Sequence, residues 1–377
     1  MANTLSNLIP DVYAALDVVS RELVGALPGV TRDPKADRLA TNQTLRIAQT
    51  PTNTTATYTP SMAIPSAIDQ TVANASLTLS KNKYAGFSWT GEEEYGMDQG
   101  PGFLSIRQNQ IAQAFRVLVN EMENDVCDAL AQGASRATGT AGTTPFASNL
   151  GDSAQVRKIL DDNGAPGSGR SLVLNTAAGA ALRTLGQLTK ANEAGQSMTL
   201  RDGELLNMHG FSIRESAQIN DATAGTGSGH LINNASGYAV GSTALTLDTG
   251  TGTILVGDII TIGSNKYVVS VALASNVVTI AAPGLVAAVA DNAAVTVNAT
   301  SARNLAFSSD AIVLATRLPM FPSEGDLAID NEVITDPRTG ISFDLRVYPG
   351  DGMVLYRIHA LWGYKVLKPA HSAILLG

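Results

Sequence analysis

This sequence has little of what many enzymes and nucleic-acid-binding proteins depend on. It has one cysteine, Cys127, so it can form no intrachain disulfide and no cysteine-rich zinc site. Lysine and arginine number 25 against 33 acidic residues, and the net charge of -8 argues against a protein whose main task is binding nucleic acid. The most apolar stretch, residues 277–290, is interrupted by Pro283-Gly284, which rules against a membrane span.

Charged residues are scarce as well. They make up 15% of the 377 residues, whereas ordinary soluble domains have roughly a quarter. The hydrophobic fraction is ordinary at 44%, so Ala, Gly, Ser, Thr and Asn have replaced the missing charge. A solvated monomer usually keeps more charge for solubility. We infer that much of the surface faces other protein.

Catalytic signatures are also missing. The four histidines do not pair at metal-ligand spacing. The glycine-rich segments 164–169 and 225–229 lack the Lys-Ser/Thr ending of a phosphate-binding P-loop. We therefore predict a non-enzyme with no catalytic residue, no cofactor and no metal. His359 lies in a strand-like run and is expected to be a hydrogen-bonded structural histidine. Cys127 is expected to be a buried structural thiol.

One long amphipathic helix is predicted over residues 104–132. Pro101-Gly102 mark its start and Gly133 its end. At 1.5 Å per residue the helix is about 40 Å long, which exceeds a compact core. It is either a helix across the back of a large sheet or the spine of an assembling subunit. Apolar residues recur at intervals that reduce to threes and fours: Leu104, Ile111, Phe115, Leu118, Met122, Val126 and Leu130.

Before this helix, the chain alternates between regular and irregular sequence. A first helix is predicted over Pro10–Leu27. Residues 31–66 are rich in Thr, Asn and Pro and cannot form their own core, so they are a linker or an arm that orders on a neighbour. Alternating runs at 75–79 and 84–89 flank Lys81-Asn82-Lys83, which predicts a long hairpin and favours the arm.

Three consecutive glutamates, Glu92, Glu93 and Glu94, follow the predicted hairpin. Adjacent carboxylates can act as acid and base or bind a metal, but the sequence shows no partner converging on them. We predict an acidic solvated turn or one side of an ion pair between subunits. Together with Lys81 and Lys83 of the hairpin, these glutamates are our candidate intersubunit contacts.

The second half of the chain contains an α/β pattern and a β-rich segment. Residues 221–301 have almost no charge and carry turn signals such as Gly263-Ser264-Asn265, which predicts a small antiparallel barrel or sandwich inserted into a host fold. A helix is predicted to end at Asp162, with a helix over 176–188. Strands are predicted at 171–175, 205–219, 244–247, 258–262, 267–272, 276–280, 294–297, 304–307, 311–315, 341–348, 353–367 and 373–376.

The order of these parts resembles the major capsid (coat) proteins of tailed bacteriophages, which have the Hong Kong ninety-seven fold. The closest likeness is to the short-tailed-phage coat family that carries an insertion domain. The resemblance is carried by 104–132, by 304–312 with Arg317-Leu318-Pro319, and by 356–364 with Pro369. It spans nearly the whole chain and depends on the order and length of the parts.

This resemblance implies an α+β fold with a long spine helix, a projecting hairpin (E-loop) within about 41–89, an axial α/β domain and an inserted small antiparallel β-barrel. The implied parts are an N-terminal helix or arm at 1–30, the extended arm and E-loop at 31–100, the spine helix of the peripheral domain at 101–135, the first part of the axial domain at 136–220, the inserted barrel at 221–301, and the axial and peripheral completion with C-terminal strands at 302–377.

The resemblance also implies a function. The subunit would assemble into hexamers and pentamers of an icosahedral head that encloses double-stranded DNA without binding it specifically. Its partners would be copies of itself, a scaffolding protein, a portal and a decoration protein, with no membrane. It would be made in the host cytoplasm and end in the virion shell. Some relatives crosslink a lysine to a neighbour's asparagine, but no catalytic glutamate is evident beside Lys81 or Lys83, so no crosslink is predicted.

Two alternatives stay open at this point. An encapsulin-like protein compartment would share the fold, although the inserted β-domain favours a phage. A protein of a different class, a β-rich glycan-binding protein or hydrolase, would be expected to show a signal segment, clustered aromatic residues and paired acids. Only Tyr238 and Tyr267 are aromatic within 221–301, which is little stacking surface for a sugar.

Overall fold

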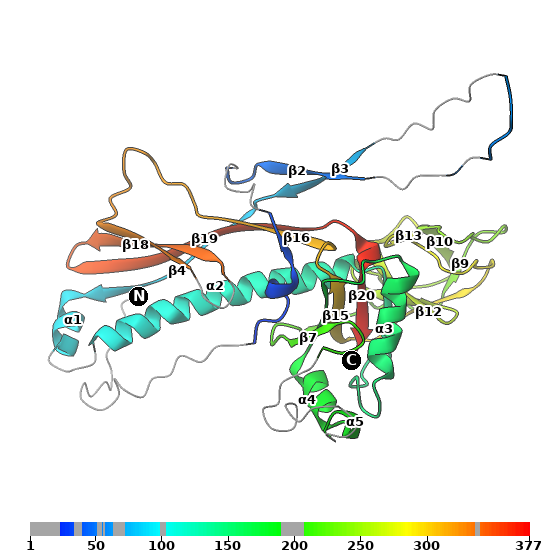
Figure 1. The fold of residues 1–377 in the computed structure, drawn as a ribbon, viewed down its shortest axis with the longest axis horizontal. Helices are drawn as coiled ribbons and strands as arrows, with labels where there is room; N and C mark the ends of the chain where they lie inside the picture. The colour runs from blue at the N-terminus through cyan, green and yellow to red at the C-terminus, as the bar shows by residue number, and fades with distance from the viewer. Residues whose placement is uncertain are drawn as a thin grey trace.

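The computed structural model describes residues 23–33, 40–50, 55, 57–62, 72–98, 103–189, 207–335 and 340–377. The helix predicted over Pro10–Leu27 lies outside the described residues except for its last few positions. There the backbone is not α-helical before a single 3-10 turn at Leu27–Gly29. The molecule is elongated along one helix, α2, with a sheet near each end (Figure 1).

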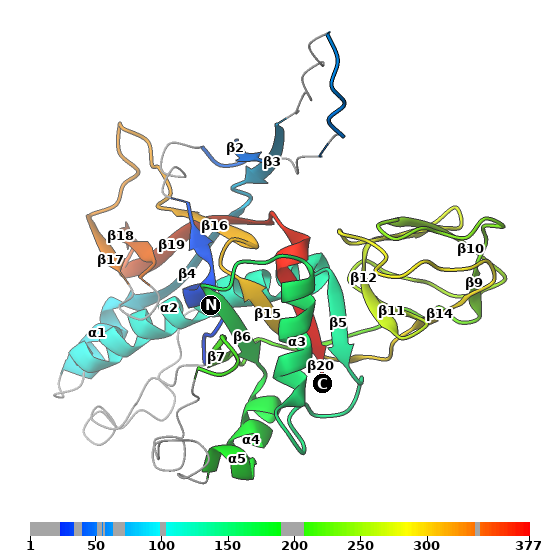
Figure 2. The ribbon, with the colours of Figure 1, turned by 45° about the vertical axis from the view of Figure 1, so that its right-hand side comes forward.

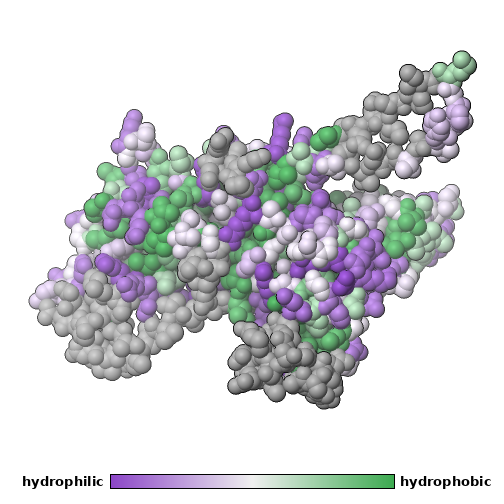
Figure 3. Space-filling model, viewed as in Figure 1, coloured by the Kyte–Doolittle hydropathy of each residue, from purple (hydrophilic) through white to green (hydrophobic). Residues whose placement is uncertain are grey.

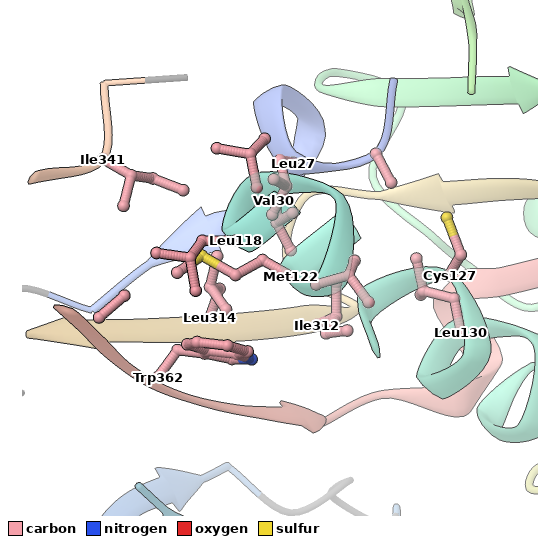
Figure 4. Close-up of a cluster of buried hydrophobic side chains, with 14 of the residues drawn as sticks. Leu27, Val30, Leu118, Met122, Cys127, Leu130, Ile312, Leu314, Ile341 and Trp362 are labelled. Carbon is pink, nitrogen blue, oxygen red and sulfur yellow. The ribbon is translucent and has the colours of Figure 1, made fainter. Parts of the chain in front are cut away.

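Helix α2 extends over Phe103–Gly133 and confirms the long helix predicted from periodicity. Its stripe residues Leu118, Met122, Val126 and Leu130 are each at most 1% exposed. They form one core cluster with strand residues from the far end of the chain, among them Ile312, Leu314 and Trp362 (Figure 4). A preceding short helix, α1, covers Gly91–Asp98.

The first sheet lies along the first half of α2 (Figure 1). Its central strand β19 pairs with β4 along one edge, and with β18 and then β16 along the other. Asp351 and Gly352 form the turn that joins β18 to β19, so β18 extends two residues beyond its predicted end, through Pro349 and Gly350. The strands are β1 (Thr31–Arg32), β4 (Lys81–Thr90), β16 (Ile312–Arg317), β17 (Asp330–Thr335), β18 (Ser342–Gly350) and β19 (Met353–Val366).

The hairpin predicted from 75–79 and 84–89 is wrong. Strand β3 (Ala73–Thr78) pairs with β2 (Thr44–Gln49), and β4 pairs over its whole length with β19. The intervening Lys-Asn-Lys contains no Asn-Gly, Asp-Gly or Gly-Gly pair, the pairs that most favour a tight hairpin turn. Leu77 and Leu79 are instead fully buried against Leu361 and its neighbours, which fixes β3 on the first sheet.

The second sheet packs three helices against its strands. Helix α3 (Gly151–Asp162) and strand β6 are close to the predictions. The helix predicted over 176–188 is interrupted, because Leu185 adopts an extended backbone and buries its side chain, so α4 (Thr176–Thr184) ends and α5 (Gly186–Thr189) begins. The strands are β5 (Arg136–Gly139), β6 (Arg170–Leu174), β7 (Ser212–Glu215), β8 (Asp221–Ala222), β15 (Ser301–Ser308) and β20 (Ser372–Leu376).

Residues 230–297 form a separate group of antiparallel strands at the end of α2 (Figure 2). Their pairings run β11-β14-β9-β10-β13-β12 and close through β12 and β11, around a cluster of their own that includes Tyr267. Strand β12 also pairs with β5, which joins this group to the second sheet. The strands are β9 (His230–Ile232), β10 (Ala244–Asp248), β11 (Ile259–Ile262), β12 (Asn265–Ala274), β13 (Val277–Ile280) and β14 (Ala294–Val297); β9 was not predicted.

Asp310 fixes the segment that leads into the last strand, β20. Its Oδ2 atom lies 3.1 Å from Lys368 Nζ and 2.9 Å from His371 Nδ1. Burial alone would raise the pKa of Asp310, but hydrogen bonds from Ser308, Lys368 and His371 outweigh burial and lower the pKa. A lowered carboxyl pKa stabilises the fold above the unfolded pKa, and this stability is lost as the pH falls through the folded pKa.

We expect Asp310→Asn to lower the thermal midpoint at neutral pH and to weaken the pH dependence of stability below about pH 4, where aspartate ordinarily titrates. Thermal melts between neutral and acidic pH would measure both effects. Asp351→Asn, in the exposed turn before β19, is the matched control. The assignment fails if the two variants lose stability in parallel across the pH series.

Candidate assembly surfaces

The two lysines predicted as contacts lie on β4 and face helix α2. Lys81 Nζ is 3.2 Å from Asp125 Oδ1, and Lys83 Nζ is 3.2 Å from Glu121 Oε1. Residues two apart on a strand share a face, as do residues four apart on a helix, so both pairs form at once. These ion pairs fasten β4 to α2 within one chain; an intersubunit role for either lysine stays a prediction.

Asp125 connects this surface to the core. Its Oδ2 atom accepts a hydrogen bond of 2.9 Å from Trp362 Nε1, and Trp362 is fully buried. Burial disfavours the charge of Lys81, but its hydrogen bond and ionic attraction to Asp125 outweigh burial and raise the lysine pKa. Sequence periodicity placed Asp125 off the apolar stripe and gave no sign of this role.

The three glutamates do not form a turn before the long helix; they occupy the first turn of α1. Thr90 and Glu93 cap this helix reciprocally: Glu93 Oε2 accepts from the Thr90 backbone N–H at 2.8 Å, and Thr90 Oγ1 accepts from the Glu93 backbone N–H at 3.3 Å. Glu92 and Glu94 are exposed. Negative charge near a helix N-terminus is favourable, which explains why a helix rather than a solvated turn forms here.

A fully buried carboxylate, missed in the sequence, holds the N-terminal segment. Glu123 of α2 accepts backbone hydrogen bonds from Gly25 at 2.8 Å, Ala26 at 2.7 Å and Leu27 at 2.8 Å. We call this group the Glu123 clamp. The available signal was spacing: Val119, Glu123 and Cys127 recur every four residues beside the apolar stripe. Cys127 is buried as predicted, and burial raises its pKa.

The hydrogen-bonded role predicted for His359 is contradicted at its Nε2 atom, which is buried without a hydrogen-bond partner among the described residues. The ring lies between Tyr84, 5.7 Å away, and Phe321, 5.3 Å away, measured between ring centroids. Burial lowers the pKa of His359, and Asp344 only partly opposes this effect. Strand alternation could not show that a distant loop supplies Phe321.

The loop that carries Phe321 connects β16 to β17 and, with Arg346 of β18, lines a hollow of about 510 Å³. Asp326 holds the loop by accepting from Arg346 Nη1 at 3.0 Å and from the Tyr348 hydroxyl at 2.8 Å. In the described part of the chain, no group of three His, Cys, Asp or Glu side chains could hold a metal ion. Within the same residues, no helix is long and apolar enough to cross a membrane.

Comparison with solved structures identifies the fold. A chain from Mycobacterium phage Che8 superposes with a TM-score of 0.56 and 16% identity, covering 99% of this chain and 98% of that chain. A chain from the capsid of the cyanophage P-SCSP1u gives a TM-score of 0.52 and 12% identity, covering 96% and 91%. The chain has a phage capsid fold. No family model and no curated protein match the sequence.

The described surface of this capsid fold exposes large apolar side chains in several places, among them three groups of residues. Figure 3 shows one of them as green atoms over the strand group at 230–297, beyond the end of α2. The other two are the segment between β2 and β3 and the loop that bounds the hollow. The residues are Val240, Leu255, Val256 and Val271 in the strand group, Tyr58 and Met62 in the segment, and Met320, Leu327 and Ile329 in the loop.

Proposed function

We propose that this protein is a major capsid protein that assembles into hexamers and pentamers of an icosahedral phage head around double-stranded DNA. The observation that carries the proposal is the match to two phage structures over nearly the full length of all three chains. A match of this extent includes both sheets, the long helix and the outlying strand group. A shared local motif could not produce it.

The parts of the chain take proposed roles in that shell. Helix α2 is the spine of the peripheral domain, the β2–β3 pair belongs to the E-loop, and the second sheet with α3 to α5 forms the axial domain. The strand group within 221–301 is the inserted barrel. Support comes from the exposed apolar side chains on the β2–β3 segment and the strand group, since monomeric proteins rarely leave large apolar patches uncovered.

The charge of the chain is consistent with enclosure of DNA rather than specific binding. The net charge is -8, so the protein as a whole repels a polyanion. We propose a non-enzymatic subunit that resides in the virion shell after assembly in the host cytoplasm. A scaffolding protein, a portal and a decoration protein are the proposed partners.

Negative-stain electron microscopy of the protein expressed alone tests the proposal, with sizing chromatography beside it. We expect closed shells, tubes, or rings of five or six subunits. If the protein alone stays monomeric, the same measurement is repeated with a candidate scaffold protein from the same genome. A strictly monomeric protein at high concentration in the presence of scaffold would contradict the proposal.

A further inference from the structure

One arginine on the first sheet is held in place but has no anion. The Arg357 guanidinium lies between two tyrosine rings, 5.0 Å from the centroid of Tyr84 and 5.5 Å from that of Tyr348. It has no hydrogen bond or ion pair to any residue that the structure describes, and its Nε atom is buried and unpartnered. Stacking orients a guanidinium for bidentate recognition of a carboxylate or phosphate.

The neighbouring residues that the structure describes leave the positive charge of Arg357 without a counter-charge. Its register partner on β18 is Arg346, and like charges directly opposite in a sheet repel. Arg346 is neutralised, because its Nε is 2.8 Å from Asp344 Oδ2 and its Nη1 is 3.0 Å from Asp326 Oδ2. The partner of Arg357 on β4 is Gly86, whose missing side chain leaves the guanidinium uncovered on that side. We call Arg357 with Tyr84 and Tyr348 the arginine cradle.

The same end of the molecule presents unpaired carboxylates. Strand β4 leads directly into α1, whose first turn carries Glu92 and Glu94 (Figures 1 and 2). Both side chains are exposed, and neither contacts a basic group within the described ranges. The next residue, Tyr95, is 68% exposed, and Tyr84 of the cradle is 60% exposed. An aromatic contact can therefore accompany the ion pair.

We propose that the arginine cradle binds the acidic first turn of α1 from a second copy of this chain, with Arg357 pairing to Glu92 or Glu94. This inference rests on the proposed function, because it supplies one subunit contact of the shell. The cradle and the acidic turn are different surfaces, so the contact is heterologous. Repeated contacts of this kind close into rings when the rotation between subunits allows.

A charge swap tests the contact. We expect Arg357→Glu alone and Glu92→Lys with Glu94→Lys alone to lose the assembled fraction seen for the wild type in sedimentation. The protein carrying all three changes should regain it, because the ion pair is restored with reversed polarity. Circular dichroism and thermal melts of each variant show whether it is folded. Arg157→Glu is the control, since Arg157 is a half-exposed arginine on α3 whose contacts, to Asp161 and to the backbone carbonyl of His209, are with residues outside the cradle and the acidic turn.

A second test, disulfide crosslinking, does not require the charge-swapped variant to regain assembly. The natural thiol of Cys127 is buried, so Tyr84→Cys with Glu92→Cys in one chain should give a ladder of covalent oligomers on a non-reducing gel. Neither single variant should give more than a dimer. If the wild type forms shells and folded Arg357→Glu assembles just as well, this contact is wrong and the proposed function stands. Failure of the wild type to assemble would overturn both.

A phosphate group has the chemistry to bind in the same cradle. Measuring DNA binding and assembly on one variant distinguishes a phosphate ligand from a carboxylate of a second copy. If Arg357→Gln assembles normally but loses binding of duplex DNA that the wild type shows, the cradle is a phosphate site and the contact between copies is wrong. Unchanged DNA binding together with defective assembly supports the contact.

Discussion

Replacing Glu123 by alanine is expected to reduce the free energy of unfolding by about 3–5 kcal/mol, because three buried backbone N–H groups lose their acceptor and each unpaired group costs roughly 1–3 kcal/mol. The affected donors are Gly25, Ala26 and Leu27, and the carboxylate that they share is fully buried. Urea denaturation would measure the loss. Amide hydrogen exchange should accelerate most at residues 25–27.

Glu121 provides the matched control for the Glu123 clamp. It lies two residues earlier on α2, its side chain is 35% exposed, and it forms an ion pair with the half-exposed Lys83. Exposed ion pairs contribute less than about 1 kcal/mol, so Glu121→Ala should have a small effect. The stability loss of Glu123→Gln should fall between those of Glu121→Ala and Glu123→Ala. The glutamine amide keeps one acceptor oxygen, but its N–H hydrogens face the backbone N–H donors. Equal losses for Glu121→Ala and Glu123→Ala would refute the clamp.

Replacing Asp125 by alanine has the second largest expected effect, about 2–4 kcal/mol. The substitution leaves the buried indole N–H of Trp362 without an acceptor and removes the counter-charge of Lys81. Trp362 stands in the cluster between α2 and the first sheet, so the loss should loosen that junction rather than a single side chain. Thermal melts would measure the stability.

Two further variants separate the contributions of Asp125. Asp125→Asn keeps an oxygen that can accept from Trp362 but loses the ion pair, so it should retain most of the stability. Lys81→Met should cost less than Asp125→Ala, because the lysine side chain is 35% exposed and solvent screens its charge. If Lys81→Met is as damaging as Asp125→Ala, the ion pair rather than the indole hydrogen bond dominates, and our assignment is wrong.

Features that repeat over short distances were predictable from the sequence. The apolar stripe of α2 recurs within a few residues, so periodicity alone gave its bounds nearly correctly. The strands of the 230–297 group were predicted well for the same reason, because alternation and turn residues are local. Strand β9 was missed since His230–Ile232 is too short to show alternation.

Features that depend on distant partners were not predictable. The alternation in β3 and β4 showed which side chains share a face, but not that β3 pairs with β2 and β4 with β19. The candidate contacts were affected in the same way. Lys81 and Lys83 were predicted in the turn of a hairpin, whereas they lie within β4, and only the fold brings Asp125 and Glu121 beside them.

The sequence by itself determined the long helix, the scarcity of charge and the order of parts that resembles a phage capsid protein, because each is a property of neighbouring residues or of composition. Only the tertiary structure decided the strand pairings, the Glu123 clamp and the arginine cradle. Each of these joins groups far apart in the chain: Glu123 is 97 residues from Ala26. Which groups meet over such separations follows from how α2 and β19 pack, and no local pattern in the sequence encodes it.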